Sequence, residues 1–136
     1  APADRSERGV RGRAPLTLAA LGAAGLLVAA LAACGGAPAP LPTPPPGAVI
    51  ITAQGTAFVS PPYTAPANAA FTLFFENRDN EPHNVRVWDA ANASVYTTEI
   101  IQGPAAKAEQ VPALPAGTYR LTCDIHPDMT AQLNVQ

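Results

Sequence analysis

Between residues 48 and 136 the sequence alternates short runs of β-branched and aromatic residues with turns rich in proline, glycine and asparagine. No run there has the apolar spacing of a convincing helix. Many short runs separated by turn residues are typical of an antiparallel sandwich or barrel. We therefore predict an all-β domain without a substantial helix. The expected strands are residues 48–53, 56–60, 70–77, 84–88, 94–101, 118–123 and 130–135.

The first 33 residues have the composition of an export signal. Four arginines precede twenty uncharged residues, 14–33, which lead into the motif LAAC at residues 31–34. This motif resembles the lipobox at which bacterial lipoprotein precursors are cleaved and acylated on the new N-terminal cysteine, here Cys34. The alternative is that residues 14–33 remain as a membrane anchor, because at about 1.5 Å per residue they match a bilayer core of about 30 Å. Both alternatives place the rest of the chain outside the cytoplasm, because the arginine-rich flank stays inside.

We divide the chain into an export signal (1–33), a lipidated cysteine with a proline-rich tether (34–47) and a folded domain (48–136). The tether holds six prolines between residues 35 and 47 and no charge, which favours extended polyproline II over a packed core. We expect a lipid-anchored protein of the bacterial cell envelope whose domain faces the periplasm or the exterior. Mass spectrometry of membrane-extracted protein tests this expectation: the chain should begin at an acylated Cys34, and recovery of residues 14–33 would contradict it.

The charge of the mature part argues against nucleic acid as a partner. After residue 33 the chain carries four basic and eight acidic residues, a formal charge of −4, whereas proteins that bind nucleic acid present basic surfaces. The 89 residues from 48 to 136 are enough for one small core. We expect a monomer.

Strand parity brings several metal-binding side chains to the inner face at one end of the domain. Cys123 shares the parity of the apolar residues in the strand that it ends, and His83 shares that of the two valines that follow it. Met129 has the inward parity of the strand that it precedes. His126 lies in the turn between Cys123 and Met129, which gives the pattern C-x-x-H-x-x-M.

A thiolate, two imidazoles and a thioether form a soft donor set that suits copper better than calcium, magnesium or structural zinc. The thioether distinguishes copper from zinc, because a weak axial methionine is a feature of blue-copper centres and adds nothing to a zinc site. Each residue alone also has a structural explanation, such as a core methionine or a buried cysteine. A disulfide between Cys34 and Cys123 is a further alternative for an exported chain. The gathering of all four donors at one end favours a metal site.

Two segments carry a resemblance to a known family. EPHNVRVW (81–88) and PAGTYRLTCDIHPDMTAQLNV (115–135) resemble the cupredoxins, the small type 1 blue-copper proteins, and most closely those of the amicyanin and plastocyanin type. The resemblance implies a Greek-key β-sandwich with one type 1 copper ion. It implies that the copper ligands are His83, Cys123, His126 and Met129. It also implies that Asn84, which is not itself a ligand, links the two ligand-bearing segments to each other.

The resemblance implies one-electron transfer between redox proteins and no enzymatic activity. Multicopper oxidases need many more histidines than the two in this sequence. The alternative is a copper-binding module for storage, sensing or delivery, although such sites tend to be rich in methionine and histidine. Five of the eight carboxylates cluster in sequence around the ligand segments, with Arg78 to offset one of them, and predict attraction of a basic partner such as a cationic cytochrome c. They are Glu76, Asp79, Glu81, Asp124 and Asp128.

Overall fold

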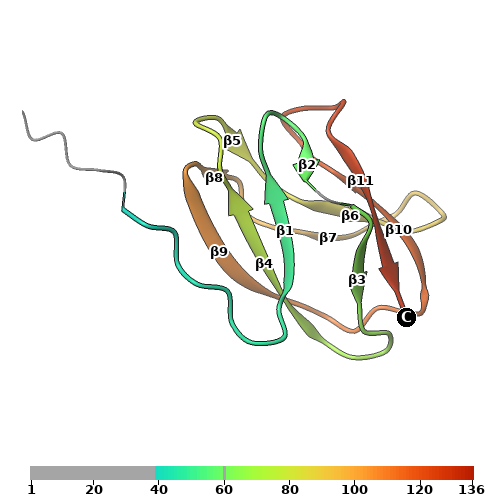
Figure 1. Cartoon of the computed structure of the whole chain (residues 1–136). Helices are drawn as coiled ribbons and strands as arrows, with labels where there is room; N and C mark the ends of the chain where they lie inside the picture. The colour runs from blue at the N-terminus through green and yellow to red at the C-terminus, as the bar shows by residue number, and fades with distance from the viewer. Residues whose placement is uncertain (1–38, 60) are drawn as a thin grey trace, which may run out of the picture. The chain divides into compact units, whose positions relative to one another are not determined.

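A computed structural model describes residues 39–59 and 61–136, all of which fall in one compact unit (Figure 1). The export segment, Cys34 and the first part of the tether lie outside the described residues. No helix occurs within these ranges, and thus none there that could cross a membrane. The strands are β1 (Val49–Ala53), β2 (Phe58–Val59), β3 (Tyr63–Ala65), β4 (Phe71–Asn77), β5 (Pro82–His83), β6 (Arg86–Trp88), β7 (Ser94–Thr97), β8 (Ile101–Gln102), β9 (Ala105–Val111), β10 (Gly117–Thr122) and β11 (Thr130–Val135).

The strands form two main sheets, in the orders β2-β1-β4-β9 and β3-β11-β10-β6-β7, with a short β5-β8 pair at one end. The chain crosses between the two sheets repeatedly, as Greek-key connections require, so the all-β sandwich is confirmed. The pairing is antiparallel in most places, but β1 runs parallel to β4 and β3 parallel to β11. These two parallel pairs are possible because strands from distant parts of the chain lie side by side.

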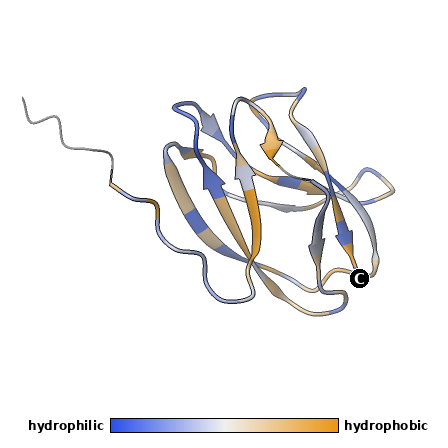
Figure 2. Ribbon diagram, viewed as in Figure 1, coloured by the Kyte–Doolittle hydropathy of each residue, from blue (hydrophilic) through white to orange (hydrophobic). Residues whose placement is uncertain are grey.

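The core lies between the two sheets and follows the predicted parity. Leu73 and Phe75 of one sheet and Leu121 and Leu133 of the other belong to one buried cluster. In Figure 2, β1 and the first part of β4 are hydrophobic, whereas the end of β4 is hydrophilic. This gradient leaves an apolar core in the middle of the sandwich and places polar residues near the end that carries His83.

The strand predictions missed β3, β9 and the two-residue strand β5, which ends just before the predicted run 84–88. β9 has the sequence AAKAEQV, in which alanine, lysine and glutamate are poor strand formers, and it pairs only with β4 at the edge of its sheet. β3 is a three-residue strand flanked by prolines on both sides. The predicted run 94–101 divides into β7 and the start of β8, with a break at residues 98–100.

A buried asparagine shapes the turn that leads from β4 to His83. The side-chain amide of Asn77 donates to the carbonyl oxygens of Glu81 (2.7 Å) and Ile101 (2.9 Å), and its Oδ1 accepts from the amide of Asp79 (3.0 Å). Gly103 packs against this turn so closely that an added Cβ would lie 2.2 Å from the carbonyl oxygen of Asp79. The turn before His83 is therefore fixed by packing and by hydrogen bonds.

We predict that Gly103→Ala destabilises the domain by about 1–3 kcal/mol, because the methyl group must displace backbone and a buried side chain. Urea unfolding followed by circular dichroism measures this change. Gly117→Ala is the matched control, since its added Cβ meets nothing closer than 3.8 Å. Equal stability of the two variants would contradict this account of the turn.

Candidate metal centre

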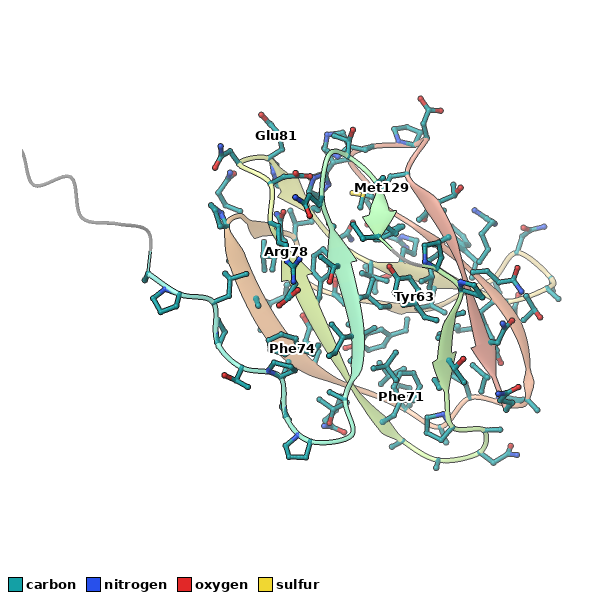
Figure 3. All side chains as sticks on the ribbon, viewed as in Figure 1. Tyr63, Phe71, Phe74, Arg78, Glu81 and Met129 are labelled. Carbon is teal, nitrogen blue, oxygen red and sulfur yellow. The ribbon has the colours of Figure 1, made fainter. Side chains whose placement is uncertain are left out.

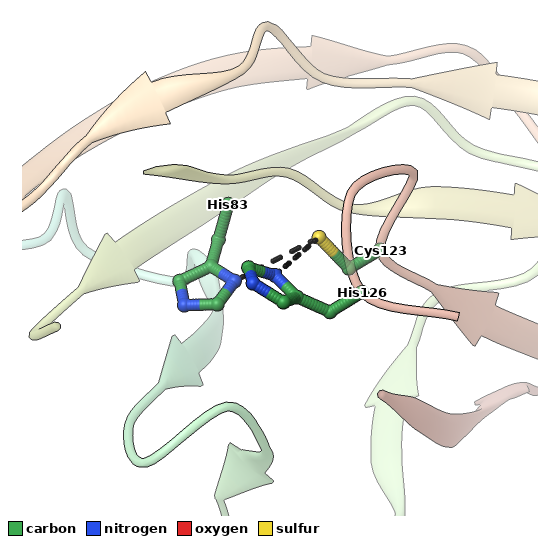
Figure 4. Close-up of side chains that lie close together, drawn as sticks. All are labelled: His83, Cys123 and His126. Carbon is green, nitrogen blue, oxygen red and sulfur yellow. Dashed lines mark hydrogen bonds between the residues drawn. The ribbon is translucent and has the colours of Figure 1, made fainter. Parts of the chain in front are cut away.

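Three of the four predicted donors converge at one end of the sandwich (Figure 4). The Sγ atom of Cys123 lies 3.7 Å from Nδ1 of His83 and 3.8 Å from Nδ1 of His126. The donor atoms of these three residues all lie within 4.8 Å of one another. A single ion can therefore contact one sulfur and two imidazole nitrogens without a large movement of the chain.

The two ligand segments come from different parts of the chain and are held by the sheets. His83 ends β5 and is fully buried, and Cys123 directly follows β10 and is also buried. Residues 123–129 return to β11 as a tight loop, because the amide of Met129 donates to the carbonyl oxygen of His126 (3.0 Å) and the amide of Cys123 to that of Met129 (3.2 Å). This loop places His126, which is half-buried, at the edge of the site.

Met129, the fourth predicted donor, lies in the same loop and is 2% exposed. It lies at the end of the sandwich that carries Glu81 and the turn before His83 (Figure 3). Its burial agrees with the inward parity expected from the sequence. Its role as an axial ligand stays a prediction.

Asp79 contacts His83, an arrangement that the sequence did not indicate. Its carboxylate lies 2.9 Å from Nε2 of His83 and also accepts from the amides of Gly55 (2.7 Å) and Thr56 (3.1 Å). A carboxylate acceptor requires an imidazole proton on Nε2, and in the neutral ring this leaves the lone pair on Nδ1, the nitrogen that faces Cys123. Partial burial opposes ionisation, but the hydrogen bonds from the two amides and from His83 hold the pKa of Asp79 below its usual value.

Asn84 and Arg86 join the segment of His83 to the loop of Cys123. The side-chain Oδ1 of Asn84 accepts from the amide of Asp124 (2.8 Å), and its Nδ2 donates to the Asp124 carboxylate (2.8 Å). Arg86 donates to the same carboxylate, which is the main reason that the pKa of Asp124 is lowered. The side chain of Asn84 thus joins the two segments, and its role behind the copper ligands stays a prediction.

Comparisons with known proteins agree with this architecture. The family model described as "Cupredoxin-like domain" matches residues 23–135, so the chain belongs to the cupredoxin-like family. Comparison with curated protein sequences found no match.

Solved structures of two cupredoxins match the fold. Amicyanin from Paracoccus versutus has 23% sequence identity and a TM-score of 0.51, with 68% of this chain and 84% of that chain covered. Reduced auracyanin from Roseiflexus castenholzii has 16% identity and a TM-score of 0.57, with 66% and 97% covered. A reduced point variant of amicyanin has 22% sequence identity and a TM-score of 0.52, with 68% of this chain and 85% of that chain covered.

The donor set of this end fits one type 1 copper ion. The group contains a buried cysteine sulfur and two imidazole nitrogens, and a methionine lies in the same short loop. Thiolate and thioether are soft donors that copper accepts in both of its common oxidation states, whereas zinc sites do not use thioether. The residues that would hold the ion are His83, Cys123, His126 and Met129.

We predict that Asp79→Ala weakens copper binding by about 10–100-fold, because the carboxylate that orients His83 is lost. Competition with a chelator on the folded protein measures the affinity. Glu81→Gln is the matched control, because this residue is exposed and lies in the same turn. An Asp79→Ala affinity equal to that of the control would show that His83 needs no such support.

Proposed function

We propose that the protein carries single electrons between redox proteins by means of one type 1 copper ion held by His83, Cys123, His126 and Met129. The observation that carries this proposal is the convergence of the Cys123 sulfur with two imidazole Nδ1 atoms at one end of a cupredoxin-like sandwich. When bound, copper supplies a centre that alternates between Cu(II) and Cu(I). The task of the protein is to hold the ligands in an arrangement that suits both states.

The residues around the site are arranged for this task. Asp79 fixes the tautomer and the ring position of His83, and Asn84 fixes the backbone of the cysteine loop. Cys123 is 3% exposed and His83 is fully buried, so water is kept from both ligands. Rigid, buried ligands rearrange little when the charge of the centre changes, which lowers the barrier to electron transfer.

We propose that electrons enter and leave through His126 at the end of the domain. It is half-buried, and its neighbours Ile125 and Pro127 are exposed, with Ile125 at 40% exposure. A redox partner that covers this end would come close to an imidazole that is itself a ligand. The exposed isoleucine offers such a partner apolar surface.

The charge around this end is lower than the sequence suggests. Arg78 offsets one carboxylate, Glu76, and Arg86 pairs with a second, Asp124. Asp79 keeps its charge, but its side chain is only 16% exposed. The remaining carboxylates of the predicted group, Glu81 and Asp128, are exposed. We propose that these two attract a basic partner such as a cationic cytochrome c. The rate of electron transfer should then fall with salt in the wild type and less in Glu81→Gln with Asp128→Asn.

The location proposed from the sequence remains part of this function. A lipid on Cys34 would hold the domain at the outer face of a bacterial membrane, and the proline-rich tether would let it reach membrane-bound redox partners. The alternative function, copper storage or delivery, needs a site that exchanges its metal readily. The buried thiol and the single methionine favour the electron carrier instead.

We predict that the soluble domain loaded with Cu(II) is intensely blue and has a narrow copper hyperfine splitting in electron paramagnetic resonance, because a thiolate is a direct ligand. Cys123→Ser should abolish the colour, whereas Met129→Gln should retain a copper site with a changed reduction potential. Asp128→Asn is the control in the same loop and should leave the spectrum unchanged. A colourless, tetragonal Cu(II) spectrum of the wild type would contradict the proposed function.

A further inference from the structure

Both neighbours of Cys123 in the sequence are fixed by side chains of β6. On one side, the indole Nε1 of Trp88 donates to Oγ1 of Thr122 at 2.8 Å. On the other side, Arg86 donates to both carboxylate oxygens of Asp124, from Nε at 2.6 Å and from a terminal nitrogen at 2.8 Å. The thiol is therefore held between two anchored residues.

The guanidinium of Arg86 is itself held in place. It donates to Oγ of Ser94 at 3.1 Å and lies over the ring of Trp88 at 5.5 Å. Arg86 also lies opposite Thr122 in the pairing of β6 with β10. A planar guanidinium with a fixed orientation forms a two-point contact with a carboxylate, which specifies both distance and direction.

Asp124 directly follows Cys123, and Asp79 contacts His83, so both carboxylates lie close to any ion held by these ligands. Of the two, Asp124 is the one that Arg86 contacts. A negative charge beside the centre favours Cu(II) over Cu(I), and a positive charge has the opposite effect. The side chains of Arg86 and Asp124 are each 30% exposed, which leaves their interaction only partly screened by water. The positive charge of Arg86 therefore reduces the effect of the Asp124 charge on the metal.

We propose that Arg86 is a positioning residue for the copper site: through Asp124 it holds the thiolate of Cys123 in place, and it neutralises the carboxylate beside that ligand. The proposal has two parts, the positioning of Cys123 and the neutralisation of Asp124. Only the second part rests on the proposed function. The first part concerns the loop of the metal-free protein. It predicts that loss of the two-point contact opens the loop more often even when no copper is bound.

Alkylation of Cys123 in the metal-free protein tests the first part. A buried thiol reacts only when the loop opens, so the rate reports the open population. Arg86→Gln should raise the rate about three- to five-fold, the effect that loss of a partly exposed ion pair allows. Arg120→Gln is the matched control, because Arg120 also lies over the Trp88 ring, at 5.1 Å, but donates to Asn92. Equal rates in the two variants would overturn the positioning role.

The reduction potential of the copper-loaded protein tests the second part. Arg86→Gln should lower the potential and Asp124→Asn should raise it, whereas Arg86→Lys, which keeps the charge but not the two-point contact, should leave it near the wild-type value and still raise the alkylation rate. Shifts of the same sign in Arg86→Gln and Asp124→Asn would overturn the charge role. Circular dichroism checks that each variant is folded. If Arg86→Gln does not fold, the alkylation rate of Arg86→Lys still tests the positioning of Cys123, and the potential of Asp124→Asn still tests the effect of charge. A wild-type protein that is not blue would refute the proposed function but leave the alkylation result valid.

Discussion

The structure depends on one constraint, which is that a buried cysteine and a buried histidine from segments forty residues apart must meet at the same point. Cys123 and His83 are both withdrawn from water, and their Sγ and Nδ1 atoms lie 3.7 Å apart. A sulfur–nitrogen contact of this length is a weak hydrogen bond, which adds little to holding the two segments together. Their proximity is therefore maintained by the sandwich and by the side chains behind them.

The supporting side chains act in two groups, one for each ligand segment. Asn77 shapes the turn before His83, and Asp79 fixes the imidazole through Nε2. Asn84 and Arg86 hold Asp124, and with it the start of the cysteine loop. Because Asp79 and Asp124 are engaged in these contacts, they contribute less negative charge to the surface than their positions in the sequence suggest.

The sequence was sufficient for the strands and ligands whose patterns are local. The parity of Cys123 and Met129 could be read because each adjoins a strand with clear alternation, and both side chains are buried as expected. The strand β9 could not be predicted in this way, because its residues are poor strand formers that are ordered by pairing with β4. The role of Asp79 depends on the β1–β2 turn, whose amides lie more than twenty residues upstream. Contacts of this kind follow from the tertiary structure and have no signal in the local sequence.

The central claim is that the protein holds the same three strong donors in both oxidation states of copper. X-ray absorption spectroscopy at the copper edge measures this directly on the loaded domain at pH 7, first oxidised and then reduced. The account predicts one sulfur and two imidazole nitrogens at short distances in both states, with little change between them. Loss of an imidazole or of the sulfur on reduction, or a shell of oxygen and nitrogen alone in the oxidised protein, would contradict it.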